Sequence, residues 1–281
     1  MSHLSNRRLE LRVLRDAVRL TLCRRWPRPK KLAQSDVRHD AAAGAGAGAG
    51  TWATALHEGL AALARQVPIA GACLHVQLSD ALVHFDVVQG DFADKSARQL
   101  HSFAQACAAE LLGERVNQHT LRWQLQCDER HLLLCAVPDA LLEALKTAAH
   151  AHGLSLASCE PSFVAQWNAH ARGALGDAVV FAVATGLNAM IACVRDGAIT
   201  AVSNGPWFAE RHCAASAGLL ARQGMTDAAD RSTLDLQVDR LLASHGFDAA
   251  EPWAFVVVRP RVHQAELSAR WTMLPAVGGV Q

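Results

Sequence analysis

The chain has 281 residues, of which 51% are hydrophobic and 19% charged, and its formal net charge is +1. This length allows one large domain or two of ordinary size, with ample material for a hydrophobic core.

The charge is unevenly distributed. Residues 1–31 contain ten Arg or Lys against Glu10 and Asp16, so this segment carries +8 and residues 32–281 carry −7. Because residues 32–281 are mildly acidic, nucleic acid is not expected as a partner of this larger part of the chain. Residues 1–31 alone are compatible with an acidic partner or an anionic membrane surface.

Eight cysteines are spread along the chain, and no two form C-x-x-C. Most lie in apolar runs, which favours free thiols and a reducing compartment. The N-terminal segment has no continuous apolar stretch, so no secretory signal is expected. The longest uncharged run, residues 178–194, has polar residues at its middle and is interpreted as two strands around a loop rather than a membrane span.

Residues 7–25 are predicted to form a helix, because apolar residues recur at the helical period: Leu11, Leu14, Val18 and Leu22. Four arginines line the flank of that stripe: Arg8, Arg12, Arg15 and Arg19. Two interpretations remain open. The helix packs on its own domain with solvated arginines, or it is a basic amphipathic helix that lies on anionic lipid or on an acidic partner.

The next segments are less regular. Residues 31–40 give at best a weak strand pair, and the Gly-Ala alternation of residues 41–50 predicts a flexible linker. A second helix is expected over residues 52–66. Residues 72–78 and 81–88 then predict a hairpin around Ser79 and Asp80.

The middle and last thirds alternate between helical and strand patterns. Helices are expected at residues 95–112, 138–152, 161–171, 212–223 and 231–244. Strands are expected at residues 120–127, 131–137, 154–158, 178–184, 189–194, 199–203 and 255–258, with a tight turn at Arg195-Asp196-Gly197. This mixture predicts an α/β or α+β chain with two sub-lobes.

The order of these segments resembles the actin-like PilM and GspL group of type IV pilus and type II secretion assembly proteins. The resemblance covers about residues 71–205 and rests on a hairpin-helix-hairpin pattern, on Val137-Pro138-Asp139-Ala140-Leu141, on Cys159-Glu160-Pro161 and on the Arg195-Asp196-Gly197 turn. It implies an actin-like fold of the sugar-kinase and actin class with two lobes. The sequence leaves open whether the first lobe is complete.

The resemblance also suggests domain boundaries. We expect a basic helix at 1–31, a degenerate first-lobe segment at 32–70, an inserted subdomain with following helices at 71–172, a second lobe at 173–259 and a tail at 260–281.

In the resembling family, an Asp-x-Gly loop opens the second lobe and helps to hold Mg²⁺. This chain has Val183-Ala184-Thr185-Gly186 there, and neither Val183 nor Ala184 offers an oxygen ligand. The first phosphate loop is expected in residues 31–40 but is not recognisable, and Asn204-Gly205-Pro206 replaces the usual Gly-Gly. Thr185 and Gly186 are the candidate remnant of a phosphate-binding loop.

Other catalytic signals are weak. The fourteen histidines show no zinc-site spacing, and Ser216 lacks the preceding strand that a nucleophile elbow needs. No catalytic residue, metal site or cofactor is therefore predicted.

The resemblance implies a non-catalytic cytoplasmic scaffold, peripheral at the inner membrane. Such a protein binds the cytoplasmic tail of a membrane-anchored assembly protein and relays contact with a motor ATPase. Two alternatives stay open. One is an ATP-binding or ATP-hydrolysing actin-like phosphotransferase, with ATP and Mg²⁺ as ligands. The other is a peripheral membrane adaptor that acts through its basic N-terminal helix.

Overall fold

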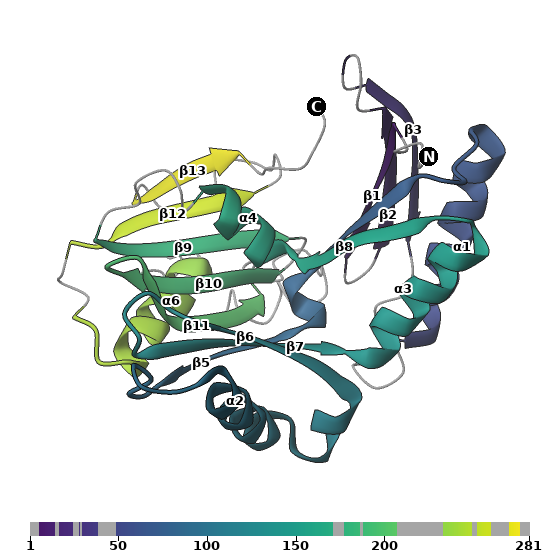
Figure 1. Cartoon of the computed structure of the whole chain (residues 1–281). Helices are drawn as coiled ribbons and strands as arrows, with labels where there is room; N and C mark the ends of the chain where they lie inside the picture. Colours follow the sequence, from purple (N-terminus) through teal and green to yellow (C-terminus); the bar gives the residue numbers. More distant parts are fainter. Residues whose placement is uncertain are drawn as a thin grey trace, which may run out of the picture.

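The computed structural model (Figure 1) describes residues 6–14, 17–24, 28, 30–38, 49–170, 177–185, 188–206, 233–248, 252–259 and 270–275. The chain forms two five-stranded sheets, a smaller three-stranded sheet and the helices that cover them.

The first sheet has the strand order β3-β2-β1-β4-β8. Its strands are β1 (Arg7–Val13), β2 (Ala17–Arg24), β3 (Lys30–Arg38), β4 (Cys73–Leu78) and β8 (Ser155–Pro161). Strand β2 is antiparallel to both of its neighbours, β3 and β1, whereas β1, β4 and β8 run parallel to one another. This sheet is assembled from segments more than 100 residues apart in the chain.

The helix expected at residues 7–25 is therefore wrong, because these residues form β1 and β2. The buried apolar side chains alternate along both strands: Leu9, Leu11 and Val13, then Val18, Leu20 and Leu22. This period of two places all of them on one face of the sheet. The weak strand pair expected at 31–40 is one strand, β3.

Two helices cover that apolar face, α1 (Ala49–Gln66) and α3 (Asp139–Ala151). Leu56, Leu60 and Leu63 of α1 and Leu145 of α3 join the strand side chains in one buried cluster. The helix expected at 52–66 is confirmed, and it begins inside the Gly-Ala segment. The rest of the linker expected at 41–50, residues 41–48, lies outside the described residues.

The second large sheet repeats the order of the first, as β11-β10-β9-β12-β13. Its strands are β9 (Ala178–Thr185), β10 (Asn188–Arg195), β11 (Ala198–Pro206), β12 (Ala254–Arg259) and β13 (Trp271–Pro275). Helix α6 (Thr233–Ser244) packs on one face, and α4 (Ser162–His170) lies on the other. The two sheets define two lobes, so the first lobe has a complete five-stranded sheet.

The third sheet is inserted between β4 and β8 and has the order β5-β7-β6. It contains β5 (His84–Gln89), β6 (His119–Leu125) and β7 (His131–Pro138), with α2 (Ala97–Leu112) packed on it. The hairpin expected at 72–78 and 81–88 is wrong. Strand β4 belongs to the first sheet and β5 to the inserted one, and the short 3-10 helix η1 (Asp80–Leu82) separates them.

The structure divides the expected 71–172 segment. Residues 84–138 form the inserted sheet with α2, whereas β4, α3 and β8 belong to the first lobe. Strand β13 was not expected from the sequence. The helix expected at 212–223, which includes Ser216, lies outside the described residues.

Candidate functional site

The first sheet has one polar face. The apolar residues of β1, β2 and β4 point toward α1 and α3, so the alternate residues lie on the opposite face. Those residues are Arg8, Glu10, Arg12, Arg19, Thr21, His75 and Gln77, with Ser158 and Glu160 continuing the face on β8. We call this surface the polar face of the first sheet.

Strand register arranges the polar face into rows across the sheet. One row runs Arg19, Arg12, Gln77, Glu160, each residue pairing with the next on a neighbouring strand. It lies at the carboxyl ends of the parallel strands, where open α/β sheets commonly bind ligands. The row below it runs Thr21, Glu10, His75, Ser158.

Two of the three arginines on this face have ion-pair partners. Arg19 Nε donates to Asp36 Oδ1 at 2.9 Å. Arg8 Nε lies 3.1 Å from Glu10 Oε1 without hydrogen-bond geometry. These pairs offset the positive charges of Arg19 and Arg8.

Arg12 differs from both. It is half-buried, and no carboxylate of the described residues lies within ion-pair distance of it. Burial lowers the pKa of the Arg12 guanidinium; Glu10 acts in the opposite direction, and the like charge of Arg19 lowers the pKa further. Arg12 is therefore a partly desolvated cation that no described acidic residue contacts.

A small hollow opens on the same face. Its cavity of about 160 Å³ is lined by Arg8, Glu10, Arg12, His75, Gln77, Ser158, Glu160 and Ala165, among others. His75 Nδ1 and Ser158 Oγ lie 2.9 Å apart in its floor. Ala165 comes from α4, so the hollow lies where the first sheet meets that helix.

Beside this face, Asp80 joins three parts of the molecule. Its carboxylate accepts from the backbone N–H of Phe163 at the start of α4, and its carbonyl accepts from Asn204 Nδ2 of β11 at 2.6 Å. Asp80 is 1% exposed. Asn204, the first residue of the Asn204-Gly205-Pro206 segment that replaces the usual Gly-Gly, thus links the second lobe to the end of β4.

The expected phosphate-binding loops differ from those of a metal-dependent nucleotide site. Val183 and Ala184 are buried on opposite faces of the second sheet, so neither presents an oxygen ligand. Thr185 Oγ1 is buried and has no hydrogen-bond partner among the described residues. Gly186 lies outside the described residues.

The first phosphate loop is not at 31–40, because residues 30–38 form β3. The counterpart of the β9–β10 turn, given the shared strand order, is the β1–β2 turn, which Leu14 N and Ala17 O close at 2.8 Å. Val13 ends β1 before this turn and is buried in the core. Neither turn is preceded by an acidic residue on its strand end.

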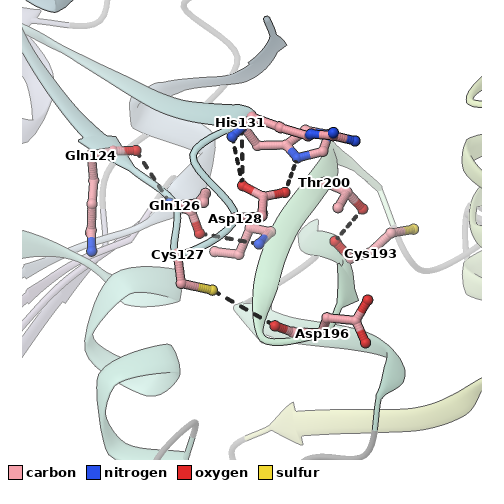
Figure 2. Close-up of polar contacts among 10 residues, drawn as sticks. Gln124, Gln126, Cys127, Asp128, His131, Cys193, Asp196 and Thr200 are labelled. Atoms are coloured by element: carbon pink, nitrogen blue, oxygen red, sulfur yellow. Dashed lines mark hydrogen bonds and ion pairs between the residues drawn. The ribbon is translucent and has the colours of Figure 1, made fainter. Parts of the chain in front are cut away.

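The inserted sheet contacts the second lobe through two turns, as Figure 2 shows. Buried Gln126 accepts from the backbone N–H of Ile199 at 3.1 Å, and Cys127 Sγ lies 3.7 Å from the carbonyl of Asp196. Asp196 and Gly197 have positive φ values of 51° and 79°, as the predicted tight turn requires. The insert is thus held against the second lobe.

A hydrogen bond between two side chains stabilises the turn of the insert. Asp128 Oδ2 lies 2.5 Å from His131 Nδ1. Burial acts to raise the pKa of Asp128, but hydrogen bonds from His131 and Arg130 outweigh it and lower the pKa. This pair has a structural role in the turn.

The structure brings together three of the four predicted arginines: Arg8, Arg12 and Arg19 lie on one sheet face. Arg15 lies outside the described residues. Sequence reasoning missed Gln77 and Glu160, since only the register of β1, β4 and β8 places them beside Arg12. Glu160 belongs to the Cys159-Glu160-Pro161 motif, which was the available signal.

Within the described part of the chain, no group of three or more His, Cys, Asp or Glu residues could hold a metal ion. In the same residues, no helix is long and apolar enough to cross a membrane.

Two lobes with the same sheet order, and an insert between β4 and β8, define the actin-like fold. Comparison with solved structures supports this assignment. A Bacteroides thetaiotaomicron protein with an actin-like ATPase fold and unknown function matches with a TM-score of 0.51 at 8% identity, over 94% of this chain and 86% of that one. The fold predicted from the sequence is confirmed.

Two further matches are assembly proteins. The cytoplasmic domain of EpsL, an inner membrane component of the Vibrio cholerae type II secretion system, has a TM-score of 0.54 at 12% identity, covering 98% of this chain and 90% of that one. The PilM-PilN type IV pilus biogenesis complex has a TM-score of 0.59 at 14% identity, covering 90% and 81%. No protein-family model and no curated protein matches the chain.

Proposed function

We propose that this protein is a non-catalytic cytoplasmic scaffold of a type IV pilus or type II secretion-like assembly platform. It binds the cytoplasmic segment of a membrane-anchored partner and is thereby held at the inner membrane. Contact with a motor ATPase belongs to the same proposal. The support is an actin-like fold similar to EpsL and PilM, in which the described ends of β1 and β9 carry no acidic residue.

The observation that carries the proposal is that the described ends of β1 and β9, which precede the two equivalent turns, have no acidic side chain. Val13 ends β1, and Val183 and Ala184 precede Thr185 at the end of β9; these three apolar residues are buried. Mg²⁺ needs hard oxygen ligands, so phosphoryl transfer would receive no carboxylate ligand from either strand end. The architecture of two lobes is retained, which suits a protein that binds partners.

The test is reciprocal co-purification from the cells that make this protein. With an affinity tag on the chain, a membrane-anchored assembly protein with a short cytoplasmic segment is expected in the detergent-solubilised complex. A tag on that partner should recover the chain in turn. Recovery of the chain alone in both directions would contradict the proposal.

One observation favours a second candidate, nucleotide binding by the same fold. The buried Thr185 Oγ1 has no hydrogen-bond partner among the described residues, and Thr185 is half of the predicted remnant loop, Thr185 and Gly186. The third alternative, a basic amphipathic helix acting on membranes, loses its basis because residues 7–13 and 17–24 are strands.

A further inference from the structure

Two opposite charges lie in one row on the polar face and make no ion pair with any residue that the structure describes. Arg12 on β1 and Glu160 on β8 flank Gln77 of β4, and the three residues are in direct register. We call these three residues the charged row. Among the described residues, no ion pair of 4 Å or less is made by Arg12 or Glu160, whereas Arg8 and Arg19 are both paired.

The spacing of the charged row is set by the sheet. Neighbouring strands lie about 4.8 Å apart, so the Cα atoms of Arg12 and Glu160 are separated by roughly 9 to 10 Å. A polyproline II segment has three residues per turn and advances about 3.1 Å per residue. Two side chains three positions apart in such a segment point to the same side and lie about 9 Å apart, which matches the two ends of the row.

We propose that the charged row binds a segment of a partner protein in the polyproline II conformation, with a carboxylate over Arg12 and a basic side chain three residues away over Glu160. This inference rests on the proposed scaffold function and specifies the partner's chemistry. Gln77, between the two charges, can both donate to and accept from the segment's backbone. The segment then crosses the strands of the first sheet over the hollow that Arg12, Gln77 and Glu160 line.

Charge complementarity selects this occupant over others. The row is neutral overall but dipolar, so a purely acidic polymer would meet Glu160 as a like charge. An anionic lipid surface would do the same. A segment with one charge of each sign satisfies both ends and is held in a single direction.

The charged residues next to the row already have partners. Arg19, next to Arg12, is paired with Asp36, and Glu10 is paired with Arg8. A half-buried arginine gains more from a carboxylate than an exposed one does, because less water screens the pair. Arg12 is thus the anchor and Glu160 the determinant of direction.

The experiment measures binding of synthetic peptides tiled across the cytoplasmic segment of the partner recovered by co-purification. Arg12→Gln and Glu160→Gln are each expected to weaken the bound peptide about tenfold. The matched control is Arg65→Gln, an exposed arginine in the last turn of α1, which should leave affinity unchanged. Thermal unfolding of each variant checks that the fold is intact.

Charge reversal makes the assignment specific. Arg12→Glu should abolish binding of the natural peptide and restore binding of a peptide whose acidic residue is replaced by Arg. The rescued peptide should not bind the unaltered protein.

A second measurement does not need the natural partner. Arg Nε–H resonances of ¹⁵N-labelled protein are titrated with acetyl-Asp-Gly-Gly-Lys-amide, with the reversed order Lys-Gly-Gly-Asp, and with an Asn-for-Asp control. One of the two charged peptides should shift the Arg12 signal saturably, while the Asn peptide and the Arg65 signal show no change.

The outcomes separate this inference from the proposed function. If a partner binds equally well to the unaltered protein and to Arg12→Gln, and neither peptide shifts Arg12, the charged row is wrong and the scaffold function stands. If no partner is recovered, the scaffold function fails, and the peptide titration alone tests whether the charged row binds a peptide. Loss of binding to anionic vesicles in Arg12→Gln, without any peptide effect, would also overturn it.

Discussion

The Asp80 carboxylate accepts the backbone N–H of Phe163 with both oxygens, at 2.9 and 3.1 Å. This contact joins the end of β4 to the first turn of α4, across 83 residues of sequence. An acidic group near a helix N-terminus is favourable, because the helix dipole and the free N–H groups there attract negative charge. The side chain is nevertheless buried, and burial disfavours its ionised form.

Asp80 should make stability depend on pH. Burial raises the pKa of Asp80 from 3.8 to about 7, although the Phe163 N–H works to lower it. The folded state therefore binds the proton more tightly than the unfolded state. The resulting stabilisation is complete below about pH 4 and is lost as the pH rises through 7.

Urea unfolding of the natural protein and of Asp80→Asn, at each pH from 4 to 8, tests this. The difference in unfolding free energy between them should shift against the natural protein as pH rises, by up to about 1.4 kcal/mol per pH unit. Above about pH 8 it should be flat. A difference that stays constant over the whole range would show that Asp80 does not titrate there.

Asn204→Ala should destabilise the junction between the lobes. Asn204 Nδ2 donates to the Asp80 carbonyl at 2.6 Å, and removing the donor leaves that carbonyl without this partner. We expect a loss of about 1 to 3 kcal/mol in the free energy of unfolding. Ser203→Ala, one residue earlier on β11, is the control and should cost less. Equal effects of the two substitutions would argue against the link.

Gln126→Ala should loosen the inserted sheet from the second lobe. The Gln126 side chain accepts from the buried N–H of Ile199, which would lose its partner. The expected cost is about 1 to 3 kcal/mol, with faster hydrogen exchange at the Ile199 amide. Gln124→Ala is the matched control, since Gln124 takes part only through its carbonyl. Unchanged exchange at Ile199 would contradict the contact.

Thiol reactivity should follow burial. Burial raises the pKa of Cys135 and Cys193 to about 12 and that of Cys159 to about 11, so these thiols remain protonated at neutral pH. Cys127 is exposed. In the native protein, iodoacetamide should modify Cys127 well before these three, as read by peptide mass spectrometry. Early modification of Cys135 or Cys193 would show that the core opens more readily than the structure implies.

Much of the fold was predictable where local patterns were unambiguous. The 95–112 helix has a capping box at Ser96 and Gln99 and ends at Gly113, and the 178–195 strand pair is a continuous apolar run around a turn. In both places the sequence signals its own boundaries. The hairpin predicted from strands at 120–127 and 131–137 is confirmed for the same reason, as β6 and β7.

Residues 7–25 were ambiguous because two periods coexist there. Leu11, Leu14, Val18 and Leu22 fit a helix, whereas Leu9, Leu11 and Val13 alternate as in a strand. The outcome depends on pairing with β4, more than 60 residues later, which no local pattern reveals. The candidate site could not be predicted fully for the same reason. The charge of Arg12 was visible in the sequence, but only the strand register places Gln77 and Glu160 in the same row.

The central claim is that this protein keeps the architecture of an actin-like nucleotide machine without its metal-dependent chemistry. The most direct test is phosphate release from ATP by the purified chain, with and without Mg²⁺. We predict release no faster than in buffer alone under both conditions. Release that requires Mg²⁺ and is lost in Thr185→Ala would contradict the claim.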